Sequence, residues 1–436
     1  MTDVTGISGT VPAPPRASRR LARFRTTSLA FLVASGFVNI IDRSTLAIAN
    51  PLIRHDLGLS IRDMGFLLSA FLWTYAIAQL PIGAIVDRVG ARILLTCSQI
   101  LWSVAQGMCG LAGSFGQFFA MRLFLGVGEA PQFPVAARVV HDCFNTKDRG
   151  LPMGIIFSAS TLGPAVAAPL ITSLMLAFGW RWMFVIMGIT GILVAVAWFF
   201  FYRNPSDLDL DANDRFYLDA TGDDGARRIT WTDWCSLFRY RTTWGMVLGY
   251  FGLIYLVWLY TAWLPGYLEM DRHMTLPHTG LVAAIPFLFG FVGVLSGGYL
   301  IDHFAAIRLA PITACKVSAV SGLVGMALFT AVAATVDSST LAVACISAAM
   351  FLGFGGMAGF WTMVSVAAPK NYVGSLGSIM NCGGYVGGAA APMLTGMLVQ
   401  YTHSFMSALL IAAGIGLSAA LCCFLVVKQP LPEPRF

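Results

Sequence analysis

The sequence predicts an all-α membrane protein with twelve transmembrane helices in two six-helix, pseudo-symmetric halves. Three observations lead to this fold class. Hydrophobic residues make up 57% of the 436 residues and charged residues only 11%, whereas soluble domains carry about 25% charged residues. Apolar stretches of about 20 residues, enough to cross a bilayer as a helix, recur along the whole chain. Short motifs of the first half also recur in the second.

Twelve apolar stretches are long enough to span the membrane, six on each side of a polar segment. Residues 1–25 are expected to form a disordered basic cytoplasmic tail, and residues 429–436 form a second cytoplasmic tail. Between them lie two bundles, residues 26–202 and 242–428, joined by a cytoplasmic linker over residues 203–241. The expected spans are residues 28–53, 64–87, 91–113, 115–140, 150–178, 182–202, 242–268, 278–302, 308–333, 339–367, 372–401 and 404–427.

The distribution of basic residues predicts which side of the membrane each terminus and loop faces. Arginines crowd the N-terminal tail, and the loops on the same side of the predicted bundle carry further Arg and Lys residues. Such an excess marks cytoplasmic loops, and an even number of helices returns the chain to its starting side. Both termini are therefore expected in the cytoplasm. Within the linker, a short amphipathic helix is expected around Trp231–Phe238, lying on the membrane surface.

The two halves repeat each other. The segment Gly83–Asp87 is matched by Gly298–Asp302, 215 residues later. A second correspondence has an offset of 223 residues and pairs Gly154 with Gly377 and Ala168-Pro169 with Ala391-Pro392. Parallel repeats are related by an axis along the membrane normal and place the substrate site between the halves at mid-depth.

Four charged residues lie inside apolar stretches: Asp42, Arg43, Arg122 and Glu129. A charge at the bilayer centre costs roughly 2.5–3.5 kcal/mol on insertion scales, so it persists facing a cavity or a partner. Arg122 and Glu129 are seven residues apart, which places them on one helix face about 10 Å apart. Gly126-Val-Gly128 keeps that face thin. These residues indicate transport of a charged substrate, and a purely structural ion pair is the alternative.

The balance of these charges predicts a mechanism. Two acids and two bases sum to zero, so protonating Asp42 or Glu129 leaves a positive site that attracts a carboxylate. Binding restores neutrality. A nearly neutral cavity needs less free energy than a charged one to switch between outward-facing and inward-facing states. We therefore expect proton-coupled symport of a small organic anion in a lipid bilayer, by a monomer, with the proton as coupling ion and no cofactor. The histidines and cysteines lack metal-ligand spacing, so no metal is expected, and the basic residues at segment ends do not indicate nucleic-acid binding.

Gly83–Arg92 follows the pattern GxxxDRxGxR and resembles the loop motif of the major facilitator superfamily. Further segments resemble its anion:cation symporter family, which includes bacterial hexuronate, glucarate and galactonate transporters: Asn39–Arg43, Phe71–Gln79, Arg122–Pro134, Trp263–Leu268, Ala368–Lys370 and Asn381. The resemblance implies the major facilitator fold, a bacterial cytoplasmic (inner) membrane location and import of a hexonate, hexarate or hexuronate. Ile40 and Cys143 stand where the family often has Tyr and Trp. Ile40 lacks a hydroxyl, which keeps aromatic or short-chain carboxylates as alternative substrates.

The resemblance also implies roles for individual residues. Arg43 would clamp the substrate carboxylate, while Asp42 and Glu129 would carry protons and Arg122 would pair with an acid until protonation frees it. Tyr75, Gln79, Trp361 and Asn381 would contact the rest of the substrate, although Tyr75 and Gln79 could instead hold helices together. The predicted gate comprises Gly83, Asp87, Arg88, Gly90, Arg92 and Asp302. Because the seventh span carries aromatic residues but no charge, the second half is expected to supply aromatic and polar walls.

Other functions fit the sequence less well. An exporter of cationic drugs would share the loop motif but would not need buried arginines. A transport-derived receptor would carry a long signalling tail, whereas about eight residues follow the last span. An enzyme is not expected, because no nucleophile–base pair lies at membrane depth. An anion exchanger or exporter of the same fold remains an alternative.

Overall fold

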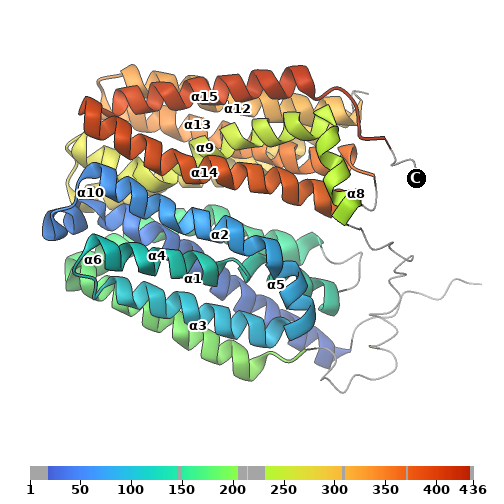
Figure 1. Ribbon diagram of the computed structural model, residues 1–436, viewed down its shortest axis with the longest axis horizontal. Coiled ribbons are helices and arrows are strands. Elements are labelled where there is room, and N and C mark those ends of the chain that lie inside the picture. Colours follow the sequence, from blue (N-terminus) through green and yellow to red (C-terminus); the bar gives the residue numbers. More distant parts are fainter. Residues whose placement is uncertain are drawn as a thin grey trace, which may run out of the picture.

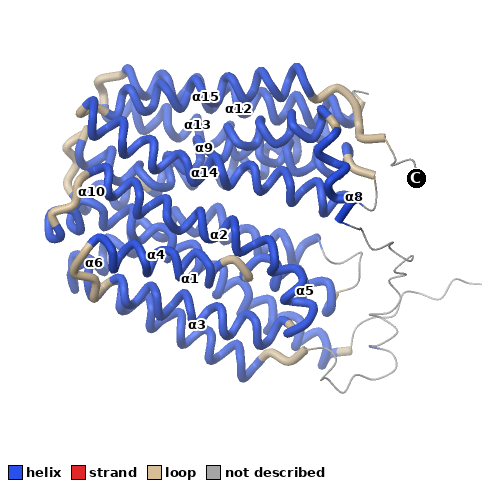
Figure 2. Tube along the Cα trace, in the orientation of Figure 1, coloured by secondary structure: helices blue, strands red, loops and turns tan. Residues whose placement is uncertain are grey.

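The computed structural model describes residues 18–144, 150–204, 214, 231–306, 310–369 and 372–432. These residues form helices and short connections, without a strand (Figure 2). The N-terminal half, or N-half, contains α1 (Arg19–Leu57), α2 (Ile61–Val89), α3 (Ala91–Cys109), α4 (Phe115–Glu129), α5 (Gln132–Cys143) and α6 (Gly150–Phe201). The C-terminal half, or C-half, contains α9 (Arg241–Met270), α10 (Leu276–Val282), α11 (Ala284–Ala306), α12 (Pro311–Thr335), α13 (Ser339–Ala367), α14 (Val373–Thr402) and α15 (Phe405–Val426).

Each half contains six membrane-spanning segments once three interruptions of the helices are taken into account. Gly179 interrupts α6 with φ 79° and ψ 162°, a backbone conformation that glycine adopts freely, so α6 comprises two spans. Pro131 lies between α4 and α5, which together make one span, and α10 and α11 likewise make one span. The result fits the twelve predicted helices. Among the described residues, eight helices are individually long and apolar enough to cross a membrane.

The N-terminal boundary differs from the prediction, because α1 begins at Arg19 rather than after residue 25. Ser18 caps the helix by accepting a hydrogen bond from the backbone N–H of Leu21, at 3.1 Å. Its own backbone N–H and hydroxyl donate to the carboxylate of Asp214, at 2.8 and 2.6 Å. Local capping thus extends the helix into the basic segment. Residues 1–17 lie outside the described residues.

The predicted linker helix is present. It forms α8 (Trp231–Ser236), followed by a single 3₁₀ turn, η3 (Leu237–Arg239). Residues 205–213 and 215–230 of the predicted linker lie outside the described residues.

The packing between the halves follows the internal repeat. Helix α2 packs against α14, and α11 packs against α6. An offset of 215 residues places 61–89 onto 276–304, the range of α10 and α11, and an offset of 223 places 150–178 onto 373–401, the range of α14. Each pair of contacting helices is therefore the pseudo-symmetric image of the other.

The halves pack most closely at one end, here called the distal end, where α1 finishes at Leu57 and α14 at Thr402. There the backbone N–H of Ile61 donates to Gln400 Oε1 at 3.1 Å. A Cβ at Gly65 would lie 2.8 Å from the Pro392 carbonyl oxygen, so only glycine fits this crossing. The apolar core is continuous across both halves at this end. In Figure 1 the ribbons of the two halves spread apart toward the opposite end, which carries the C-terminus.

Candidate functional site

Arg43 and Glu129 form a buried ion pair inside the N-half. Arg43 Nε donates to Glu129 Oε2 at 2.6 Å, and the two side chains are 6% and 0% exposed. Arg43 comes from the middle of α1, whereas Glu129 is the last residue of α4, two positions before the break at Pro131. Since a charge in this environment needs a partner, the pair stabilises both side chains at membrane depth.

Glycines on α4 bring this acid close to its neighbours. A Cβ at Gly128 would lie 2.8 Å from the backbone nitrogen of Trp102 on α3, and one at Gly126 would collide with Phe71 and Thr74 on α2. Helix α4 can therefore pack directly on α2 and α3. The predicted role of these glycines in keeping the face thin agrees with this packing.

Two aromatic rings of α2 lie against the buried arginines. The Arg43 guanidinium lies 4.6 Å from the centroid of the Tyr75 ring and 5.0 Å from that of Phe71. The Arg122 guanidinium lies 5.5 Å from the Phe71 ring. Cations at these distances are attracted to the ring faces. Both buried arginines thus lie against the aromatic rings of α2.

Asp42 is fully buried inside the N-half. It interacts electrostatically with Glu129 and Arg122 and lies beside the Trp102 indole, yet neither carboxylate oxygen reaches a hydrogen-bond partner among the described residues. Its backbone carbonyl accepts a hydrogen bond from Thr45 Oγ1 at 2.7 Å, and Gln106 Nε2 donates to the same hydroxyl at 2.9 Å. Asp42 and Arg43, although adjacent on α1, thus have different neighbours.

One expected pairing differs. Arg122 was expected to pair with an acid, but within the described part of the chain it is in no ion pair, and its Nε and Nη1 atoms have no hydrogen-bond partner. Glu129 pairs with Arg43 instead. Arg122 and Glu129 are seven positions apart, about 10 Å along α4, whereas α1 brings Arg43 directly to the helix end.

The family profile described as Major Facilitator Superfamily matches residues 32–392. The chain belongs to the major facilitator superfamily. A relative named probable L-galactonate transporter, from Escherichia coli (strain K12), is 41% identical over 435 residues, which cover 98% of this chain and 96% of the relative. A probable galactarate/D-glucarate transporter from Bacillus subtilis (strain 168) is 31% identical over 434 residues, 96% of this chain and 94% of the relative.

A solved structure has the same fold. It is a bacterial homolog of the human lysosomal transporter Spinster in an inward-facing and occupied conformation, with a TM-score of 0.77 and 20% sequence identity. The match covers 92% of this chain and 97% of that structure. Together these comparisons confirm the fold and the family resemblance read from the motifs. This chain is an integral membrane transporter and not an enzyme.

The superfamily's loop motif lies at the turn between α2 and α3. Gly90 has φ 83° at this turn, a conformation that favours glycine. Arg92 donates from Nε to the Phe199 carbonyl at 2.9 Å, which ties α3 to the end of α6 within the N-half. Arg88 is exposed. The side chains of the other three predicted gate residues, Gly83, Asp87 and Asp302, lie outside the described residues.

The predicted substrate contacts are distributed over both halves. Tyr75 lies at the ion pair, and Gln79 is half-buried one turn further along α2. Trp361 on α13 is 45% exposed and donates its indole N–H to the Tyr250 hydroxyl at 3.1 Å. Asn381 is half-buried on α14. No described contact joins Gln79, Trp361 or Asn381 to the buried charges.

Two aromatic residues of the C-half reach the site. Tyr385 on α14 donates to the Tyr75 hydroxyl at 3.4 Å, with ring centroids 4.9 Å apart. The ring of Trp258 on α9 lies 6.2 Å from that of Phe71. Sequence reasoning included Trp258 among the aromatic residues of its span but missed Tyr385. Its spacing of four residues from Asn381, one helical turn, was the available signal.

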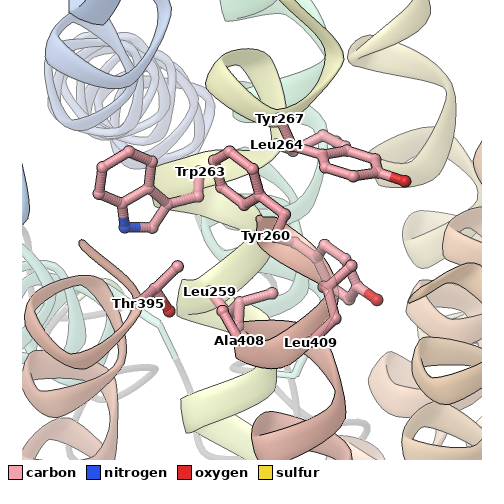
Figure 3. A pocket seen from close by; sticks show the side chains of 9 residues that line it. Leu259, Tyr260, Trp263, Leu264, Tyr267, Thr395, Ala408 and Leu409 are labelled. Atoms are coloured by element: carbon pink, nitrogen blue, oxygen red, sulfur yellow. The ribbon is translucent and has the colours of Figure 1, made fainter. Parts of the chain in front are cut away.

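Figure 3 shows a separate small pocket inside the C-half, between α9, α14 and α15. It is lined by Leu259, Tyr260, Trp263, Leu264, Tyr267, Thr395, Phe405, Ala408 and Leu409. None of these side chains is charged, so this pocket offers no ion-pair partner for an anion. Every buried charged side chain described in the membrane-spanning helices belongs to α1 or α4.

Ile40 packs tightly toward α6. Its side chain occupies the space that a Cβ at Gly163 would need, and it is almost fully buried. The residue that replaces the family's frequent tyrosine thus fills a hole between two helices of the N-half.

Proposed function

We propose that this transporter imports a hydroxylated organic anion, a sugar acid such as a hexonate, hexarate or hexuronate, together with protons. The observation that carries the proposal is the buried pair between Arg43 and Glu129. A guanidinium matches a carboxylate with parallel hydrogen bonds, so a substrate carboxylate is an equivalent partner for Arg43. The names of the two relatives, both sugar-acid transporters, support the same substrate class.

Proton coupling follows from competition for Arg43. While Glu129 is ionised it holds Arg43, and protonation removes the charge that binds the guanidinium. Arg43 can then take the substrate carboxylate, and the site returns to neutrality. Asp42 is the second proton carrier, because it is buried beside Arg122 and Glu129 and forms no ion pair in the described structure. Arg122 offsets whichever acid is ionised.

Access alternates around this site. We infer that the distal end faces outside and that the termini lie in the bacterial cytoplasm, as the distribution of basic residues predicts. The packing of Ile61 and Gly65 against α14 then seals the outer side of the site. The substrate would leave toward the end where the halves spread apart. Separating α2 from α14 at the distal end, a contact here called the distal seam, would then expose the binding site to the outside again.

The test uses proteoliposomes with a pH dye trapped inside and an inward proton gradient. Hexonates, hexarates, hexuronates, and aromatic and short-chain carboxylates are added outside one at a time. We expect internal acidification with sugar acids, and none with Arg43→Ala. A matched control is Arg62→Ala, which removes an arginine from the first turn of α2, away from the buried pair. Uptake that leaves internal pH unchanged would contradict proton coupling, and a response confined to aromatic or short-chain acids would contradict the substrate class.

A further inference from the structure

Alternating access requires that both halves contact the substrate. A ligand shifts an equilibrium between two states only by the difference in its contacts with them. All buried charges in the described membrane helices belong to the N-half. A contribution from the C-half must therefore come from neutral groups that lie close to Arg43.

Two C-half side chains contact the aromatic rings next to Arg43, and they differ in the chemical group that makes the contact. Trp258 packs against α14, where a Cβ at Gly388 would lie 2.7 Å from its Cδ1 atom, and it touches Phe71 through its ring. Tyr385 presents a hydroxyl, which lies 3.4 Å from the hydroxyl of Tyr75. Tyr385 is therefore the polar contact from the C-half.

The contact between the two tyrosines is loose. Hydrogen bonds between hydroxyls are commonly about 2.7–2.8 Å long, and they weaken as the distance grows. At 3.4 Å the Tyr385 hydroxyl has a weak partner that it can exchange for a better one. The Tyr75 ring is held independently, because Arg43 lies on its face at 4.6 Å and Phe71 lies beside it.

Tyr385 also marks the edge of the distal seam. One turn away on the distal side, the Ser69 hydroxyl donates to the Ala389 carbonyl and joins α2 to α14. One turn away on the other side, Gln79 and Asn381 are only half-buried. Tyr385 therefore lies at the depth of Arg43, because both side chains contact Tyr75.

We propose that Tyr385 is the residue through which the C-half binds the substrate. Its hydroxyl leaves Tyr75 and hydrogen-bonds to one hydroxyl of the anion whose carboxylate Arg43 holds. This inference rests on the proposed function and adds to it a residue that selects for a hydroxyl at one position of the carbon chain. The bound anion then bridges α1 and α14, and so connects the two halves.

The experiment measures kcat/KM for the best sugar acid of the panel and for its single-deoxy analogues, in wild-type proteoliposomes and in Tyr385→Phe. A net hydrogen bond of about 1 kcal/mol corresponds to roughly a fivefold preference. We expect the wild type to prefer the full substrate by about that factor at one position. Tyr385→Phe should lose the preference there, keep it at other positions and keep its dependence on the proton gradient. Tyr299→Phe on α11, a position 76% exposed, is the matched control and should behave as wild type.

The outcomes separate the two proposals. If wild type transports sugar acids and Tyr385→Phe discriminates at every position as wild type does, the inference about Tyr385 is overturned while the proposed function stands. If wild type transports none of them, the proposed function fails and the inference fails with it. If the Tyr385→Phe protein cannot be produced in the membrane, Tyr385→His is measured in its place. A changed preference at a single position of the substrate supports the inference, and an unchanged pattern of preferences overturns it.

Discussion

Replacing Glu129 by Gln should tighten anion binding at high pH, because it removes the carboxylate that competes with the substrate for Arg43. The Nε–Oε2 distance is 2.6 Å, and both side chains are nearly inaccessible. A hydrogen bond to a charged group contributes about 1.5–3 kcal/mol net. At about 1.4 kcal/mol per factor of ten, affinity should rise roughly 10- to 150-fold. Without substrate, the unpaired Arg43 should lower the melting temperature, because removing one partner of a buried pair costs about 3–5 kcal/mol.

The proposed scheme also predicts how the affinity for the substrate depends on pH. In the proposed scheme wild-type binding takes up a proton at Glu129, so affinity should fall as pH rises. Glu129→Gln resembles the protonated state at every pH, so its affinity should be high and much less dependent on pH. Isothermal titration calorimetry of purified protein at acidic, neutral and alkaline pH measures both effects. Glu269→Gln, an acid-to-amide change at a half-buried position of α9, is the control and should follow wild type. An affinity of Glu129→Gln that equals wild type at alkaline pH would refute the competition.

Three further changes test other parts of the scheme. Asp42→Asn should abolish proton-driven accumulation while substrate counterflow continues, and retained accumulation would exclude Asp42 as a proton carrier. Arg43→Lys keeps the charge but loses the planar group that lies over Tyr75, so radiolabelled uptake should show a KM raised about tenfold or more, and an unchanged KM would contradict the clamp. Gly65→Leu places a side chain where a Cβ already meets the Pro392 carbonyl, so it should hold the distal seam open. Thiol labelling of a cysteine introduced at Ser69 should then increase, and unchanged labelling would show that this crossing does not close the outer side.

Much of the fold was predictable, because the bilayer imposes strict lengths on apolar helices. The number of spans and the two repeat offsets follow from sequence patterns, and the arrangement of the helices fits them. The start of α1 was missed because the stretch around Arg19 looks like a polar tail. Its helix depends on Ser18, which Asp214 contacts from 196 residues away. A contact over that separation leaves no local signal.

The site was predictable in composition but not in pairing. Charges inside apolar spans must come together, which brought Asp42, Arg43, Arg122 and Glu129 into one prediction. Which arginine holds Glu129 depends on where α1 crosses the end of α4, and helix spacing alone does not determine that crossing. Tyr385 was missed for a related reason, because its importance comes from facing Tyr75 across the seam between the halves.

Among the described membrane-spanning helices, buried charged side chains belong to α1 and α4 alone, and this has an evolutionary consequence. Neutral substitutions along α9, α13 and α14 can reshape the space around a substrate without leaving an unpaired ion in the membrane. In the proposed scheme, the helices that couple protons and the helices that discriminate among substrates can thus diverge at different rates. We expect lineages that acquire new nutrients to differ mainly along the C-half walls, while α1 and α4 change slowly.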